Sequence, residues 1–129
     1  MAKILVIEDN PANMKLACLL LLDAGHTLLC AADAESGLTM ARDDQPDLIL
    51  MDIQLPGMDG LAATALLKGS PVTSAIPVIA LTAMAMKDDQ AKAEAAGCDA
   101  YIAKPLRHRE LRAAIDALLS RHKIEPAHE

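Results

Sequence analysis

The chain is 129 residues long, which fits one globular domain with a sizeable core. Hydrophobic residues make up 53% of it, which excludes a disordered chain. The formal net charge of −6 argues against a basic nucleic-acid-binding surface, so we expect no direct nucleic-acid partner. Phe and Trp are absent and Tyr101 is the only aromatic residue, so the core must be built from aliphatic side chains and Met.

The first predicted elements are a buried strand over residues 3–7 and a helix that runs through Ala24. Asn10 is suited to cap the free amides at the start of this helix, and Pro11 occupies a position where no N–H is needed. Gly25 is expected to end the helix.

The rest of the chain continues the alternation of strands and helices. Short apolar runs bounded by turn residues predict further strands, and amphipathic or Gly-terminated stretches predict helices. In chain order we expect a strand at 27–31, a helix capped by Asp33 and ending near Asp43, a strand at 47–52, a helix at 60–68, a strand at 76–81, a helix at 86–96, a strand at 99–103 and a helix at 106–122.

Five strands that alternate with helices predict an α/β fold with a parallel sheet and helices on both faces. We expect a doubly wound (βα)5 sheet with the flavodoxin-like strand order 2-1-3-4-5. The predicted domain spans residues 1–122 and is followed by a polar tail over 123–129.

No stretch of the sequence predicts a membrane segment. Charged residues begin at Lys3, too early for a signal peptide. The longest apolar run, residues 16–22, is far shorter than the ~18 residues of a membrane span. We therefore expect a cytoplasmic protein without a membrane partner.

The three cysteines, Cys18, Cys30 and Cys98, are widely spaced and form no CxxC motif. This spacing favours reduced, buried thiols over disulfides or zinc ligands. We expect all three to be ordinary packing residues.

Charged and polar residues stand where the predicted strands end. A parallel sheet brings the carboxyl ends of its strands to one edge, which is where ligands bind in open α/β sheets. The residues at these positions are Glu8, Asp9, Asp52, Thr82 and Lys104. Three carboxylates in one pocket need compensation, which Mg²⁺ provides through oxygen ligands. One carboxylate can also act as a nucleophile toward phosphorus, with Mg²⁺, the lysine and the threonine neutralising the phosphoryl oxygens.

Four motifs carry these residues: ILVIEDN, DLILMDIQLPGMDG, PVIALTAMA and YIAKP. With them the sequence resembles the receiver domains of response regulators, in the CheY-like superfamily, of the single-domain, DivK-like type. Receiver modules of hybrid kinases share the EDN start and the TAMAMK segment. The resemblance extends from Lys3 to about His122.

The resemblance implies a phosphorelay function with Asp52 as the phosphoacceptor. Asp9 and Asp52 would bind Mg²⁺ directly, together with the backbone carbonyl of Gln54, and Glu8 would hold the metal through water. Lys104 would pair with the phosphoryl oxygens.

The resemblance also implies a conformational switch. Thr82 would move to the phosphoryl group and Tyr101 would then turn inward, while Pro105 would follow a cis peptide bond. A histidine kinase or phosphotransfer protein would donate the phosphoryl group. A downstream effector would bind the fourth helix, fifth strand and fifth helix. Such a chain is a signalling switch rather than an enzyme.

Two surface features predict partner contacts. The four consecutive leucines of residues 19–22 cannot all be buried by one helix face, and the first helix docks the kinase in the resembled family. Basic residues at the start of the last helix form either a solvated face or a docking site for an acidic partner; they are Arg107, His108, Arg109 and Arg112. In addition, Met84 is predicted to shield the phosphoryl group from water.

Several alternative interpretations remain open on the sequence. The chain fits a Mg²⁺-dependent phosphohydrolase with an aspartate nucleophile, although the haloacid-dehalogenase type usually has Asp where Gln54 stands. It also fits a receiver excised from a hybrid kinase, or an interaction module with a vestigial pocket. At single positions, Thr82 is also suited to cap a helix, Lys104 to lie in a solvated loop, and Tyr101 to pack in the core.

Overall fold

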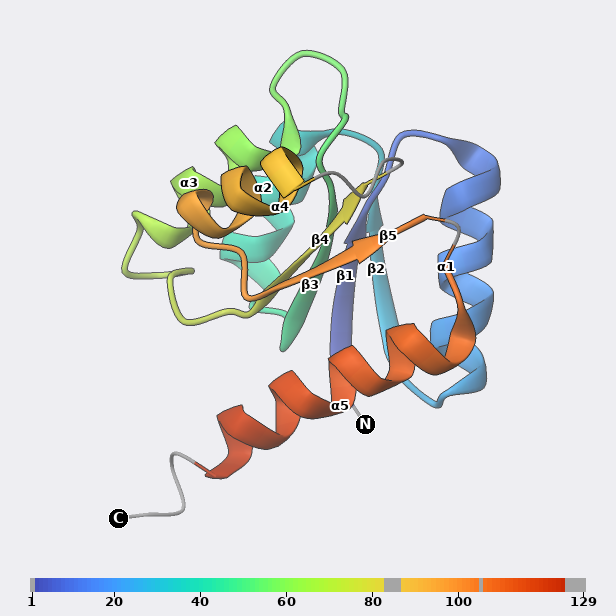
Figure 1. The fold of residues 1–129 in the computed structure, drawn as a ribbon. Helices are drawn as coiled ribbons and strands as arrows, with labels where there is room; N and C mark the ends of the chain where they lie inside the picture. Colours follow the sequence, from blue (N-terminus) through green and yellow to red (C-terminus); the bar gives the residue numbers. More distant parts are fainter. Residues whose placement is uncertain (1, 83–86, 105, 125–129) are drawn as a thin grey trace.

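Five parallel strands form one sheet in the order β2-β1-β3-β4-β5 in the computed structural model, which describes residues 2–82, 87–104 and 106–124 (Figure 1). The strands are β1 (Lys3–Ile7), β2 (Thr27–Ala31), β3 (Leu48–Asp52), β4 (Val78–Thr82) and β5 (Ala100–Ala103). This is the predicted flavodoxin-like order, which is confirmed. The first strand lies inside the sheet, paired with β2 on one side and with β3 on the other.

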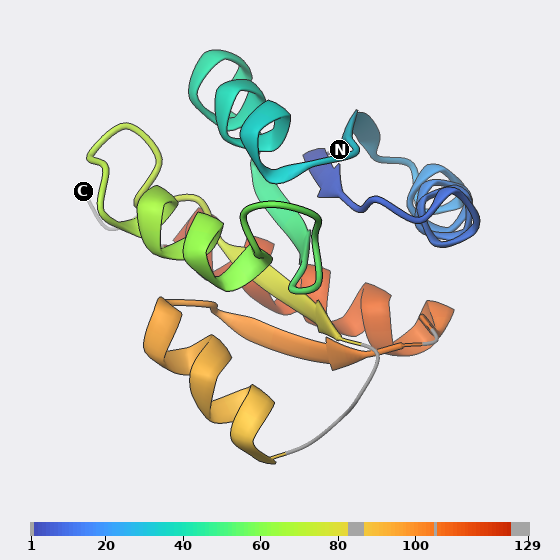
Figure 2. The same ribbon diagram turned by 90° about the horizontal axis from the view of Figure 1, so that it is seen from above.

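Five helices cover the two faces of the sheet: α1 (Pro11–Asp23), α2 (Ala34–Asp44), α3 (Gly60–Lys68), α4 (Lys87–Ala96) and α5 (His108–Ile124). Figure 2 shows α1 and α5 on one side of the sheet and α2, α3 and α4 on the other. The side chains agree with this arrangement, because successive strand residues point to opposite faces. Thus Ile4 and Val6 pack with α1 and α5, and Leu5 and Ile7 pack with α2 and α3.

Side-chain caps start three of the helices. The carboxylate or amide oxygens of Asn10, Asp33 and Asp59 accept hydrogen bonds from the backbone N–H three residues later, at 3.0, 2.7 and 2.8 Å. Such caps satisfy amides that have no partner inside the helix. The predicted caps at Asn10 and Asp33 are therefore confirmed, and the cap at Asp59 was not predicted.

The structure differs from the sequence prediction at several element ends. Strand β4 begins at Val78 instead of residue 76, because Ile76 belongs to the preceding turn, where its N–H donates to Thr73 O at 3.1 Å. Thr82, predicted just beyond this strand, is its last residue. The last helix begins at His108 rather than residue 106 and continues to Ile124, into the predicted tail. The predictions for Met84 and Pro105 lie outside the described residues.

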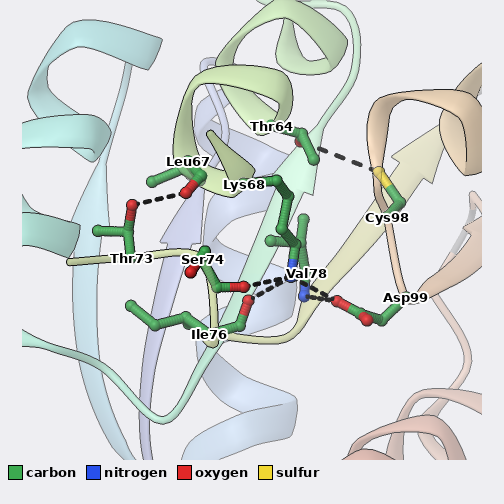
Figure 3. Close-up of polar contacts among 9 residues, drawn as sticks. All are labelled: Thr64, Leu67, Lys68, Thr73, Ser74, Ile76, Val78, Cys98 and Asp99. Atoms are coloured by element: carbon green, nitrogen blue, oxygen red, sulfur yellow. Dashed lines mark hydrogen bonds and ion pairs between the residues drawn. The ribbon is translucent and has the colours of Figure 1, made fainter. Parts of the chain in front are cut away.

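Lys68 holds together the sheet end that is opposite the strand carboxyl ends (Figure 3). Its Nζ donates to Ser74 O at 3.3 Å, to Ile76 O at 2.8 Å and to Asp99 Oδ2 at 3.0 Å. The same Asp99 oxygen accepts the N–H of Val78, the first residue of β4, at 2.9 Å. One ammonium therefore joins α3, the loop before β4 and the start of β5.

The cysteines differ from their prediction as buried residues. Cys98 is partly buried and its Sγ lies 3.9 Å from Thr64 Oγ1. Cys30 is exposed, because it lies on the edge strand β2. The sulfur atoms of Cys18, in α1, and Cys30, in β2, lie 3.5 Å apart, a contact that was not predicted.

Within the described part of the chain, every helix is too short or too polar to cross a bilayer.

Candidate functional site

The carboxyl ends of β1, β3, β4 and β5 meet at one edge of the sheet, and each carries a polar or charged residue of the predicted site. β1 leads into Glu8 and Asp9, and β3 ends at Asp52. β4 ends at Thr82, and Lys104 follows β5. The parallel registers fix these positions: Asp52 lies opposite Leu81, and Thr82 lies opposite Ala103.

Glu8, Asp9 and Asp52 form an acidic cluster in which one carboxylate oxygen of each lies within 4.8 Å of the others. Glu8 and Asp52 are buried, with 2% and 3% of their surfaces exposed, whereas Asp9 is exposed. Carboxylates at this spacing, open to solvent on one side, match the preference of Mg²⁺ for a few carboxylate ligands and retained waters. The donor set present therefore fits a hard divalent cation.

Lys104 supplies the positive charge of the site. Its Nζ lies 2.8 Å from Glu8 Oε1 and 3.2 Å from Asp52 Oδ2. Its backbone N–H donates to Thr82 O at 2.6 Å, which holds residue 104 beside the end of β4. The sequence predicted Lys104 beside Asp52, but the ion pair with Glu8 was missed. A signal for it exists, since an acidic residue that is buried needs a cation nearby.

Burial and the neighbouring charges together set the pKa directions of Glu8 and Lys104. Burial raises the pKa of Glu8 above its ordinary value and the neighbouring Asp52 adds to this, although hydrogen bonds from Lys104 and from the N–H of Asn10 oppose it. Burial alone would lower the pKa of Lys104, but Glu8 and Asp52 together raise it. The pKa values of both groups can rise together. Lys104 has two negative neighbours, whereas buried Glu8 shares its one cation with Asp52, which is also a like charge.

The Asp52 carboxylate has a different partner on each oxygen. Oδ1 accepts the backbone N–H of Gln54 at 3.0 Å, and Oδ2 faces Lys104. The Gln54 side chain is exposed, and the contact with Asp52 is made by the Gln54 backbone N–H. The carbonyl of Gln54 remains a predicted metal ligand.

Gly60 brings the start of α3 against the backbone of Asp52. A Cβ on residue 60 would lie 2.1 Å from Asp52 O and 2.7 Å from Ile53 Cα, so only glycine fits there. The N–H of Gly60 donates to Ile53 O at 3.2 Å. Sequence reasoning placed Gly60 at the start of a helix and missed this contact, which depends on how α3 returns to the sheet.

Thr82 and Tyr101 lie on neighbouring strands. Thr82 is buried at the end of β4. Tyr101 lies opposite Ala80 in the sheet and is partly buried against Ile53, Ala80 and Ala93, on the face that α4 covers. This position is near the predicted effector surface, and the packing also fits the alternative of Tyr101 as a core residue.

Fold and site together define a receiver domain, a parallel (βα)5 sheet with an acidic pocket and a lysine at its carboxyl edge. The family model of the response regulator receiver domain matches residues 4–116, and the chain belongs to this family. Receiver domains act in phosphorelay signalling.

Among characterised proteins, the chain is similar to the polar-differentiation response regulator DivK of Brucella anthropi. The two are 45% identical over 103 residues, which is 80% of this chain and 84% of that protein.

Solved structures agree with this assignment. A CheY-like response regulator receiver domain from Methanospirillum hungatei has a TM-score of 0.89 at 28% identity, covering 97% of this chain and 98% of that one. The receiver domain of a sensor histidine kinase from Pseudomonas aeruginosa has a TM-score of 0.86 at 33% identity, covering 92% and 98%. That structure has a magnesium ion coordinated in its active-site cleft.

Proposed function

We propose that Asp52 accepts a phosphoryl group from a phosphohistidine on a histidine kinase or phosphotransfer protein, and that the phosphorylated chain changes its binding to an effector. One observation carries this proposal: Asp52 is buried at a strand end beside Glu8 and Asp9, with Lys104 Nζ 3.2 Å from its Oδ2. A buried carboxylate with a cation beside it and two further carboxylates nearby is suited to receive phosphorus.

In the proposed step an Asp52 oxygen attacks phosphorus, the new P–O bond forms and the P–N bond to the histidine breaks. The bond electrons stay with the imidazole of the donor, which takes up a proton. Lys104 is placed to neutralise the phosphoryl oxygens, and the N–H of Gln54 orients the carboxylate. The chain then acts as a switch, and it assists only its own phosphorylation and dephosphorylation.

Mg²⁺ is the cofactor that the acidic cluster fits. Asp9 and Asp52 would hold it with the carbonyl of Gln54, and Glu8 would contribute through water. When bound, Mg²⁺ supplies neutralisation of negative charge on the carboxylates and the transferred group.

The output side of the proposal uses Thr82 and Tyr101. A phosphoryl group adds about −1.5 to −2 charge, which favours an inward position of the buried Thr82 hydroxyl and then of Tyr101. Such a change shifts a two-state equilibrium. Because Tyr101 packs against Ala93 of α4, this motion would reach the surface of α4, β5 and α5, where the effector binds.

The input side uses the exposed leucines of α1. Leu19 and Leu22 are each 57% exposed, and they lie on the helix that follows directly after Asp9 of the acidic cluster. A helical phosphodonor packed along α1, from these leucines to the helix start at Pro11, would reach the acidic cluster. We expect these contacts to take place in the cytoplasm. We expect no nucleic-acid or membrane partner, and the domain that makes the contacts would span residues 1–122.

The test is phosphorylation by acetyl phosphate, followed by intact mass with and without Mg²⁺. We expect one phosphate adduct on the wild-type protein that requires Mg²⁺, and none on Asp52→Asn. Equal adduct on both proteins would refute the assignment of Asp52. Catalytic release of phosphate in excess of protein, at enzyme-like rates, would favour the phosphohydrolase alternative.

The same samples report on the switch. Since Tyr101 is the only aromatic residue, tyrosine emission comes from one position. We expect phosphorylation to change this emission in the wild-type protein and to leave it unchanged in Thr82→Ala that carries the phosphate. An emission change of equal size in both would contradict the proposed order of events.

A further inference from the structure

Cys18 and Cys30 form a pair of thiols outside the acidic pocket. Cys18 lies in α1, Cys30 lies in the edge strand β2, and their Sγ atoms are 3.5 Å apart. The sulfur atoms of a disulfide are about 2 Å apart, so a modest shift of the side chains is enough to join them.

The fold places the two side chains face to face for a simple reason. Cys30 lies two residues after Leu28, so both point to the sheet face that α1 and α5 cover, where Leu28 packs. Cys18 lies one helical turn after Met14, which packs on the same face, so it projects from α1 toward the edge of the sheet. The pairing therefore follows from the packing of α1 on β2.

The two thiols differ in their access to solvent. Cys30 is exposed, whereas Cys18 is half-buried between helix and strand. Burial, with a contribution from the hydrogen bond to Cys30, raises the pKa of Cys18 to about 11. Cys30 is therefore the thiol that a small solute reaches first, and Cys18 remains protonated behind it.

We propose that Cys18 and Cys30 are an oxidation site for hydroperoxides that closes to a reversible intramolecular disulfide. The Cys30 thiolate attacks the terminal oxygen of the hydroperoxide, the O–O bond breaks, and the other oxygen leaves as hydroxide or alkoxide, so Cys30 becomes a sulfenic acid. The Cys18 sulfur then attacks the Cys30 sulfur, the S–O bond breaks, and the oxygen leaves as water with the Cys18 proton. The two thiols lose two electrons and the peroxide gains them.

The disulfide would tie the middle of α1 to the edge strand. Because Leu19 directly follows Cys18, the oxidised form would hold the exposed face of α1 more rigidly. Cys98 is not expected to take part, since burial raises its pKa and its sulfur faces Thr64.

The experiment treats the full chain with hydrogen peroxide, blocks free thiols with N-ethylmaleimide in denaturant, and records intact mass. We expect the oxidised protein to lose roughly 2 Da and to take up one maleimide instead of three, with dithiothreitol restoring three. Digestion before Asp residues cuts between Leu22 and Asp23, so the two cysteines fall in separate peptides. In the oxidised protein these two peptides should appear as one disulfide-linked species, which reduction separates.

Three variants complete the test. Cys98→Ala should still form the cross-link, whereas Cys18→Ala should instead leave a sulfenic acid on Cys30 that dimedone captures. Cys30→Ala should resist oxidation by the same peroxide dose. Cross-linked dimers, a disulfide that contains Cys98, or three free thiols after peroxide treatment would each overturn the proposal. Cross-linking at the same rate in guanidinium chloride would also overturn it, because the folded geometry would then contribute nothing.

Discussion

Lys104 lies closer to Glu8 than to Asp52: its Nζ is 2.8 Å from Glu8 Oε1 and 3.2 Å from Asp52 Oδ2. The ammonium therefore occupies the space between two carboxylates that are also candidates for holding a divalent cation. Lysine and metal repel each other there, yet both stabilise added negative charge. This relationship gives opposite expectations for metal binding and for phosphorylation.

We expect Lys104→Met to bind Mg²⁺ more tightly and to be phosphorylated more slowly. Removing the positive charge beside Glu8 and Asp52 lowers the repulsion that a cation held by these carboxylates would meet, and an effect of about tenfold in affinity corresponds to ~1.4 kcal/mol. Titration calorimetry measures the affinity, and acetyl phosphate with intact mass measures the rate. Lys15→Met, an exposed lysine of α1, is the matched control. Weaker Mg²⁺ binding by Lys104→Met would contradict the idea that the two cations compete.

We expect Glu8→Gln to be more stable than the wild-type protein at neutral pH when EDTA removes divalent cations. The folded protein raises the pKa of Glu8, first through burial, so the folded state keeps this proton to a higher pH than the unfolded chain. The stability linked to neutral Glu8 is fully present below its ordinary pKa of 4.5 and is lost as the pH rises through the folded value. Gln carries no charge at any pH and avoids this loss.

Urea unfolding of both proteins across the pH range measures this difference. The two free energies of unfolding should converge in acid and separate toward neutral pH, with the variant higher. Glu94→Gln, at an exposed carboxylate of α4 outside the pocket, controls for the change in net charge. If Glu8→Gln were the less stable protein at neutral pH, the ion pair with Lys104 would outweigh the cost of burial.

We expect Gly60→Ala to lower the free energy of unfolding by roughly 1–3 kcal/mol, because the new methyl group would overlap Asp52 O and Ile53 Cα. The backbone that must move carries the phosphoacceptor, so phosphorylation by acetyl phosphate should also slow down. Gly69→Ala, at the other end of α3, would meet Ala65 O at 3.3 Å, a tight contact but far looser than 2.1 Å, and should change stability clearly less than Gly60→Ala does. Equal effects of the two substitutions would argue against a role for the close approach.

We expect Lys68→Met to lower the free energy of unfolding by about 1–3 kcal/mol, since it removes the donor to Ser74 O, Ile76 O and Asp99. Lys68 lies at the end of the sheet opposite the acidic pocket, so the rate of phosphorylation should stay unchanged in the folded variant. Urea unfolding and intact mass provide the two readouts, with Lys15→Met as control. A changed rate of phosphorylation with an unchanged free energy of unfolding would contradict this prediction.

We expect Leu19→Ala with Leu22→Ala to reduce phosphotransfer from a phosphohistidine protein by about tenfold, as the loss of two interface side chains would. A panel of purified, autophosphorylated histidine kinases identifies a donor, and phosphorylation by acetyl phosphate should remain at the wild-type rate. Ala preserves the helix. Leu66→Ala on α3, where Leu66 is 54% exposed, should leave both reactions unchanged. Loss of both reactions in the double variant would point to damaged folding instead of a lost docking surface.

The sequence by itself determined the order and type of the elements and the family. Apolar runs, Asn10, Asp33 and the glycines that end helices act through neighbours in the chain, so local chemistry was enough to predict the β1–α1 unit and the caps. The same motifs place Glu8, Asp9, Asp52 and Lys104 at strand ends, and a parallel sheet must gather such ends at one edge.

Only the tertiary structure decided which of these groups touch. Lys104 pairs with Glu8 and Lys68 reaches Asp99 across long stretches of chain, and Cys18 meets Cys30 only because α1 packs on β2, so no local pattern predicts these distances. The close fit of Gly60 against Asp52 likewise depends on the path of α3 back to the sheet. Contacts of this kind are set by the packing of whole elements, in which a shift of about one ångström decides whether two groups interact.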